Sequence, residues 1–262
     1  GAPAETFTGR TGADGSQRLR LAFDGRDVDL PTAVRAEAAV TDVNRQAWSS
    51  QTEVLVHPSE LYVGVRSDRA FVEEGTPLRI ESIVTDIDGN AVAGREIAME
   101  AGRLEWVFAK GTWVEELTDL QTCTVESTDD VAECEFSADV GGTYKVTAVV
   151  SDESGRSNRS ELTLWVSGGG GRPTRNVAQE SVTIVPDRAE YAPGGTAEVL
   201  VRAPFRPASG QLIVRRGGVQ TTEVFDAPDG SAVLSIPIDE DDIPNLSLMV
   251  EMLAGVITGS GI

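Results

Sequence analysis

The stretch Val146-Thr147-Ala148-Val149-Val150-Ser151-Asp152 indicates the fold class of this chain. Val146, Ala148 and Val150 place an apolar side chain at every second position, which is the period of a strand with one buried face. The polar turn Glu153-Ser154-Gly155-Arg156 follows, and Leu162, Leu164 and Val166 then repeat the alternation. The segment therefore predicts two antiparallel strands joined by a tight turn.

The same two-residue period recurs along the chain, and turn signals separate its occurrences. Alternating segments lie at 34–40, 54–56, 78–80, 199–201, 234–238 and 246–252, with turn signals such as Asp88-Gly89-Asn90, Gly141-Gly142 and Asp229-Gly230 between them. No segment has apolar residues at helical spacing over three turns. Short strands in this pattern predict an all-β chain of tandem antiparallel β-sandwich domains.

Two internal repeats divide the chain. Residues 36–42 align with residues 146–152 at an offset of 110, and Asp68-Arg69-Ala70 returns as Asp187-Arg188-Ala189. We predict the C-terminal part of a sandwich in residues 1–57, with four strands in 5–57, and a complete sandwich in 58–167. A Gly-rich linker in 168–175 and a sandwich lacking its last strand in 176–262 complete the division.

The composition excludes several classes of function. The formal net charge is −20, so a surface for nucleic acid is not expected, because such surfaces are built from clustered Lys and Arg. The segment Arg215-Arg216-Gly217-Gly218 is read as a hairpin turn. No apolar stretch is long enough for a transmembrane helix, and Gly1-Ala2-Pro3-Ala4 does not begin a signal peptide.

Cys123 and Cys134 are the two cysteines of the chain. Strand-like residues flank the turn Ser127-Thr128-Asp129-Asp130 between them, so we expect the cysteines to face each other across a hairpin. An even count and this placement favour a disulfide over two free thiols. A disulfide implies an extracytoplasmic location: the periplasm, the cell surface or a membrane-anchored parent.

The sequence shows no catalytic constellation, so we predict that the chain is not an enzyme. His57 is the single histidine, and it lies beside Pro58 at a predicted domain joint without triad partners. The acidic runs at 73–74, 115–116, 129–130 and 239–242 are interpreted as solvated turns, not as paired catalytic carboxylates. No cofactor or catalytic metal is expected.

Two further features remain open. Asp86 and Asp88 resemble the start of a calcium loop but lack its later ligands, so a β-turn is the favoured interpretation and calcium binding the alternative. Trp106 and Trp113 flank Ala109-Lys110-Gly111 as an exposed hairpin, which we identify as a possible partner-binding site.

Several motifs, taken in order, resemble a known family. The segment 185–197, with its Asp187-Arg188-Ala189-Glu190-Tyr191 core and Pro193-Gly194, is similar to the domain opening of alpha-2-macroglobulins, although Arg188 and Gly195 depart from the usual Lys and Asp. Further stretches resemble the bacterial members: 41–46, 57–64, 203–205, 214–219 and 243–246. The likeness covers most of the chain, and it rests on the order of the motifs because no single one is decisive.

The resemblance implies an array of macroglobulin or fibronectin-III-like domains in a broad-spectrum protease inhibitor. In that family a protease cuts a bait segment and the protein closes around it, so the implied partners are target proteases and neighbouring macroglobulin domains of the same chain. A thioester requires Cys-x-Glu-Gln, whereas this chain has Cys123-Thr124-Val125-Glu126 and Cys134-Glu135-Phe136-Ser137. We therefore expect the thioester, and the bait, outside this chain. The alternatives are an Ig-like surface adhesin or stalk, and an accessory module of a secreted hydrolase.

Overall fold

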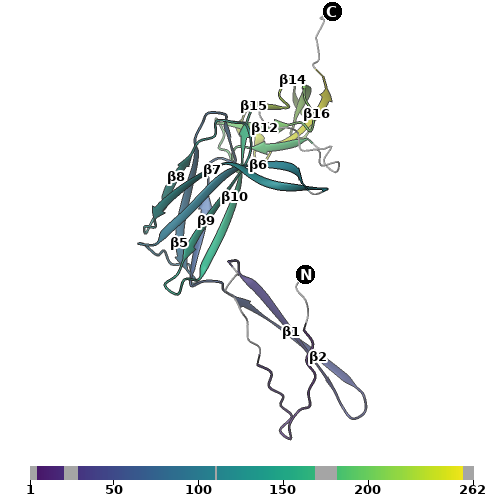
Figure 1. Ribbon diagram of the computed structural model, residues 1–262. Coiled ribbons are helices and arrows are strands. Elements are labelled where there is room, and N and C mark those ends of the chain that lie inside the picture. Colours follow the sequence, from purple (N-terminus) through teal and green to yellow (C-terminus); the bar gives the residue numbers. More distant parts are fainter. Residues whose placement is uncertain (1–4, 21–28, 110, 169–181, 256–262) are drawn as a thin grey trace, which may run out of the picture.

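The chain forms an elongated series of β-sheets. The computed structural model describes residues 5–20, 29–109, 111–168 and 182–255 (Figure 1). Within these ranges the regular structure is β-strand apart from one 3-10 helix, η1 (Glu240–Asp242), and it includes no α-helix. No helix in the described part is long and apolar enough to cross a membrane. The prediction of an all-β fold is confirmed.

The first strands form a two-stranded antiparallel ribbon, which we call the N-terminal ribbon. It consists of β1 (Thr32–Thr41) and β2 (Ala47–Val56). We expected four strands in residues 5–57, but the described residues of this stretch form two. Residues 5–20 contain no strand, because Phe7 and Leu19 are too few and too far apart to give an alternating apolar face.

The middle unit is a sandwich of two facing sheets, a three-stranded one ordered β3-β5-β8 and a five-stranded one ordered β4-β10-β9-β6-β7. The strands are β3 (Leu61–Arg66), β4 (Phe71–Glu73), β5 (Leu78–Asp86), β6 (Glu96–Ala109), β7 (Thr112–Glu126), β8 (Ala132–Phe136), β9 (Gly142–Ser151) and β10 (Ser157–Ser167). The alternating residues meet between the sheets, where Ile80, Ile97 and Val146 are fully buried. Burial of this apolar surface is the main stabilising contribution.

A disulfide joins the two sheets of the middle unit. Cys123 lies on β7, at the edge of the five-stranded sheet, and Cys134 lies on β8 in the three-stranded sheet, with a Cα–Cα distance of 6.2 Å. The expectation that they face each other across a hairpin is wrong, because the chain crosses between the sheets after β7. Ser127 holds this crossing, since its N–H donates to the Arg95 carbonyl and its hydroxyl to the Val92 carbonyl.

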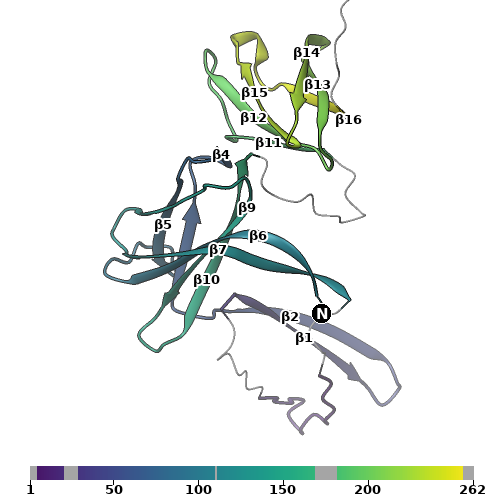
Figure 2. The ribbon, with the colours of Figure 1, turned by 45° about the horizontal axis from the view of Figure 1, so that its top comes forward.

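The C-terminal unit has two three-stranded sheets, β11-β12-β15 and β14-β13-β16 (Figure 2). Its strands are β11 (Thr183–Pro186), β12 (Thr196–Arg202), β13 (Ala208–Arg215), β14 (Val219–Ala227), β15 (Ser231–Pro237) and β16 (Ser247–Ala254). It has its own core, which includes Val199, Leu212 and Ile236. The predicted turn at Arg215-Arg216-Gly217-Gly218 joins β13 to β14.

Three tight turns share one design, in which an aspartate closes the turn that follows its strand. One carboxylate oxygen of Asp42, Asp86 and Asp152 accepts the backbone N–H groups two and four residues later, at 2.8 to 3.0 Å. The residue three positions after each aspartate has positive φ: 64° at Arg45, and 87° and 75° at the corresponding glycines. The aspartates therefore have a structural role in the turns.

The boundaries between the units stay predictions. The two hydrophobic cores are separate clusters. Apart from Gly168, the Gly-rich linker predicted at 168–175 lies outside the described residues. Residues 256–262 are also outside them, so the expected lack of a last strand in 176–262 stays a prediction as well.

Candidate functional site

The two copies of the repeated Asp-Arg-Ala motif meet at the joint between the middle and C-terminal units. The N–H of Ala70 donates to the Asp187 carbonyl at 3.0 Å, and the guanidinium of Arg69 pairs with the carboxylates of Asp187 and Glu198. Asp187 is buried, and its carboxylate also accepts the Tyr191 hydroxyl at 2.7 Å. The motif that marks the start of each unit in the sequence therefore connects the units in the structure.

A second contact crosses the same joint. The guanidinium of Arg202, from β12, lies 4.5 Å from the ring centroid of Trp165, from β10, and donates to the Thr143 hydroxyl at 3.4 Å. Burial lowers the pKa of Arg202 from its usual value. Gly141 lies here too, and a Cβ at this position would come within 2.2 Å of the Gly168 carbonyl oxygen. Glycine is thus required at this close approach of the backbones.

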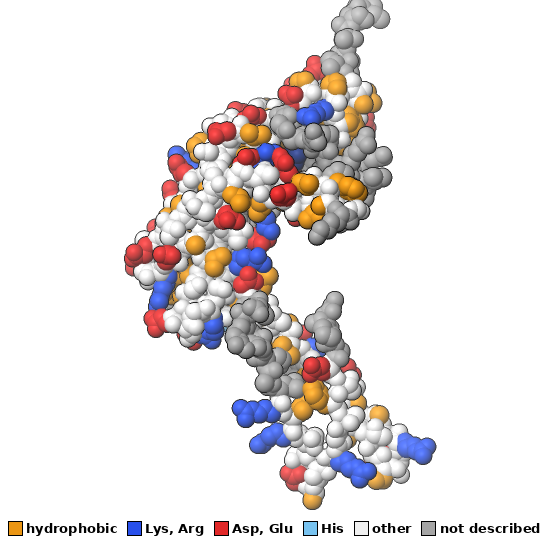
Figure 3. Space-filling view, in the orientation of Figure 1, with side chains coloured by type: hydrophobic (Ala, Val, Ile, Leu, Met, Phe, Trp, Pro, Cys, Tyr) orange, Lys and Arg blue, Asp and Glu red, His pale blue; other side chains and the backbone are white. Residues whose placement is uncertain are grey.

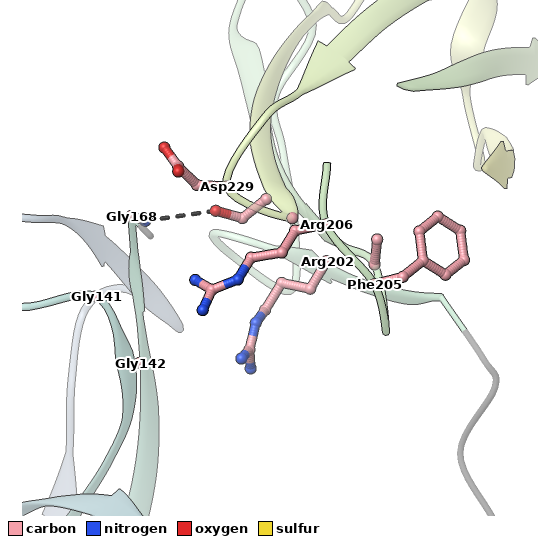
Figure 4. A pocket seen from close by; sticks show the side chains of 10 residues that line it. Gly141, Gly142, Gly168, Arg202, Phe205, Arg206 and Asp229 are labelled. Atoms are coloured by element: carbon pink, nitrogen blue, oxygen red, sulfur yellow. Dashed lines mark hydrogen bonds between the residues drawn. The ribbon is translucent and has the colours of Figure 1, made fainter. Parts of the chain in front are cut away.

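Arg202, Gly141 and Gly168 line a small open cleft between the units (Figure 4). Its volume is about 50 Å³, and its lining residues are Gly141, Gly142, Gly168, Arg202, Ala203, Phe205, Arg206, Asp229, Gly230 and Ser231. The Arg202 and Arg206 guanidinium groups extend side by side in this view, while the Asp229 carboxylate points away from them. No pattern in the sequence predicts this cleft, because its two sides come from segments about 60 residues apart.

Strand β16 has one paired edge. It pairs with β13, whereas the topologically equivalent strand of the middle unit, β9, pairs with both β6 and β10. Within the described ranges no strand pairs with the second edge of β16. Leu253 on this strand is 64% exposed.

The β6–β7 hairpin extends beyond its sandwich (Figures 1 and 2). The pairing of β6 with β9 ends at Arg103, so the later residues of β6 pair with β7 alone. Trp106, Val107 and Val114 are exposed there. The backbone of Trp113 pairs with Phe108, but the Trp113 side chain lies outside what the structure describes. Partner binding at Trp106 and Trp113 stays a prediction.

The structure places the other sequence candidates in structural contacts. His57 Nδ1 lies 2.6 Å from the Tyr62 hydroxyl. The Asp86 carboxylate accepts hydrogen bonds from the Asn90 side chain and from the backbone of Asn90 and Asp88, and these bonds lower its pKa. No group of three or more metal-ligating side chains occurs among the described residues. Calcium binding by Asp86 and Asp88 remains an untested alternative.

The acidic runs are exposed, with one exception. On the face shown in Figure 3, acidic and basic side chains are interspersed over the middle unit. Asp242 is buried, which corrects the interpretation of 239–242 as wholly solvated. Its carboxylate accepts the Asp239 N–H at 2.8 Å and the Gln220 side chain at 3.3 Å, while its carbonyl accepts Arg216. Asp242 therefore forms part of the capping box of η1, whose N-cap is Asp239, and holds the loop before β16.

Residues 182–260 match the family model described as the alpha-2-macroglobulin bait region domain. We expected the bait outside this chain. The match corrects this expectation, because residues 182–260 correspond to the bait region domain. An alpha-2-macroglobulin homolog of Nostoc sp. is 23% identical over 242 residues. That alignment covers 89% of this chain but only 12% of the relative, so the chain spans a small part of that protein's length.

Solved structures of bacterial alpha-2-macroglobulins are also similar over most of the chain. The Escherichia coli protein in its native conformation covers 86% of this chain at 16% identity with a TM-score of 0.34, and 17% of that protein is covered in turn. The Salmonella protein reacted with methylamine gives the same coverage and identity with a TM-score of 0.35. TM-scores this low support no argument about the function of this chain.

Proposed function

We propose that the chain belongs to the alpha-2-macroglobulin family and is a scaffold region of a bacterial broad-spectrum protease inhibitor. In this proposal residues 58–167 form a complete macroglobulin-like domain, residues 1–57 end a preceding one, and residues 176–262 carry the bait region domain. The match of residues 182–260 to that domain is the observation that supports the function best. Target proteases are the proposed partners.

The proposed mechanism is conformational, and no residue of this chain has a catalytic role in it. A protease cleaves the bait, and the domains of the parent protein then move around the protease. The residues described here would keep the bait region domain in position before cleavage. Two contacts suit that purpose: the ion pairs of Arg69 with Asp187 and Glu198, and the packing of Arg202 against Trp165.

The proposed location is extracytoplasmic. The disulfide between Cys123 and Cys134 would persist in an oxidising compartment and would be reduced in a typical bacterial cytosol. The parent protein is then placed in the periplasm or at the cell surface, where foreign proteases are met.

The test uses the full-length parent protein. It is incubated with several proteases of different specificity, the cut sites are mapped by mass spectrometry, and its shape is followed by sedimentation velocity. We expect each protease to cut first within a common short region, followed by an increase in sedimentation coefficient. A parent protein that these proteases leave uncut, or whose shape is unchanged after cutting, would overturn the proposal.

The matched control uses the same proteases with their active sites blocked by a small inhibitor. They retain their surfaces but cannot cut, so the shape of the parent protein should stay constant. A change of shape with the blocked proteases would mean that binding alone drives the movement.

A further inference from the structure

We propose that the cleft at the joint between the middle and C-terminal units binds a small oxyanion, with Arg202 as its principal ligand. The chemistry recognised is that of a carboxylate or a sulfate-sized ion. This inference does not depend on the inhibitory role proposed above.

Arg202 is a partly buried cation without a carboxylate partner among the described residues. Arg69 and Arg103 differ from it, since each forms ion pairs with two carboxylates. The neighbours of Arg202 are instead the Trp165 ring and the Thr143 hydroxyl. A guanidinium removed from water gains most from an anion that replaces its lost hydration.

The Arg202 guanidinium also has further hydrogen-bond donors. It carries five N–H groups in a planar fork, and the bond to Thr143 at 3.4 Å uses one of them. The Nε atoms of Arg69 and Arg159 are buried without a hydrogen-bond partner. No nitrogen of Arg202 is in that situation. Arg202 lines the cleft, and in this proposal its remaining donors bind the ion there. A planar fork of this kind suits two oxygens of one anion.

The size and lining of the cleft limit the occupant. A volume of about 50 Å³ exceeds the share of one water, roughly 30 Å³, and is far below the roughly 300–1,000 Å³ of sites for organic ligands. Arg206 brings a second guanidinium to the same opening, and the Asp229 carboxylate points away from it (Figure 4). Four of the other lining residues are glycines, which bring no side chain into the cleft: Gly141, Gly142, Gly168 and Gly230.

An ion bound here would connect the two units. Trp165 belongs to β10 of the middle unit, and Arg202 belongs to β12 of the C-terminal unit. The oxyanion has two possible sources: a free ion from the medium, or an acidic side chain from another part of the parent protein. The two sources share the same chemistry at the guanidinium.

The experiment titrates the 262-residue chain with sodium sulfate and, separately, with sodium acetate, while sodium chloride keeps the ionic strength constant. Tryptophan fluorescence is the readout, since Trp165 lies against Arg202. The variants are Arg202→Gln and, as the matched control, Arg215→Gln, which removes the same charge from an exposed position on β13. The net charge of −20 opposes general adsorption of anions, so saturable binding would indicate a defined site.

We expect saturable binding by the wild-type chain and by Arg215→Gln, and binding about tenfold weaker by Arg202→Gln. Stronger binding of acetate than sulfate would support a carboxylate side chain as the natural occupant, and stronger binding of sulfate would support a free ion. No saturable change with either anion would overturn the proposal, as would equal binding by Arg202→Gln and the wild type.

A second measurement covers the case in which Arg202→Gln does not fold. The amide and indole N–H resonances of the wild-type chain are followed by NMR during the same titrations. Saturable shifts concentrated at Thr143, Trp165 and Arg202 would support the site. Shifts spread evenly over the surface, or no shifts, would overturn it.

Discussion

The N-terminal ribbon and the β9–β10 pair are two copies of one hairpin in different surroundings. Their registers are identical once the offset of 110 residues is applied: Ala36 pairs with Thr52, and Val146 pairs with Leu162. Both hairpins close with the same aspartate turn. Local sequence is therefore sufficient to specify strand pairing, register and turn.

The two hairpins differ in burial. Val54 is 58% exposed while its counterpart Leu164 is 2% exposed, and Val40 is 54% exposed while Val150 is 1% exposed. The face of β9 and β10 packs against the sheet β3-β5-β8, whereas the described residues contain no equivalent sheet over the N-terminal ribbon. Among the described residues the same apolar pattern is thus part of a hydrophobic core in one copy and largely exposed in the other.

Truncation of one apolar side chain in each hairpin should give the largest contrast. Leu164→Ala is expected to cost about 2–5 kcal/mol in the free energy of unfolding, because it leaves a cavity in the core. Val54→Ala should change it by no more than about 0.5 kcal/mol. Urea denaturation followed by tryptophan fluorescence measures both, and equal losses would contradict the comparison.

The disulfide should matter only for the β9–β10 hairpin, since it joins the sheet that contains β9 and β10 to the sheet packed against it. Replacement of both Cys123 and Cys134 by alanine is expected to destabilise the middle unit by about 3 kcal/mol, from the loop that the bond closes. Hydrogen exchange followed by mass spectrometry should show faster exchange in β9 and no change in β1. Faster exchange in both strands would mean that the N-terminal ribbon depends on the middle unit.

The turn aspartate of the buried hairpin, Asp152, should make the stability of the middle unit depend on pH. Burial raises the pKa of Asp152, but hydrogen bonds from the Glu60 and Arg156 backbone and the Arg156 side chain outweigh this effect and lower it to about 2. Because the folded-state pKa lies below the unfolded value of 3.8, the stabilisation is complete above about pH 5 and is lost as the pH falls toward 2.

Asp152→Asn should therefore cost about 2 kcal/mol at neutral pH and much less at pH 2. Asp42→Asn is the control, because that aspartate is not buried. Urea denaturation at a series of pH values from 6 to 2 measures the difference. A constant effect of Asp152→Asn over this range would show that its carboxylate does not supply the stabilisation.

The smallest expected effect concerns the turns themselves. Arg45 has a φ of 64°, where its counterpart Gly155 has 75°. A side chain at this φ is strained by roughly 1 kcal/mol, so Arg45→Gly should protect the N-terminal ribbon and Gly155→Arg should destabilise the middle unit by similar amounts. Hydrogen exchange near each turn provides the measurement, and slower exchange in Gly155→Arg would be the contrary result.

Much of the fold was predictable from local patterns, while the site was not. The alternation in residues 146–150 and the turn at 153–156 were sufficient for β9, β10 and their connection. The path of the chain after β7 was not predictable, because Ser127 acts through Val92 and Arg95, which are distant in sequence. The same reason applies to Arg202, whose partners Thr143 and Trp165 lie in another unit.

The sequence by itself determined the strands, their register and the aspartate turns, since these depend on side-chain alternation and on hydrogen bonds within a few residues. It also carried the motifs that relate the chain to alpha-2-macroglobulins. Tertiary structure alone decided which sheets the disulfide joins, and that an arginine without a carboxylate partner among the described residues lies at the joint. Those features depend on contacts between residues far apart in the chain, and no local pattern encodes such contacts.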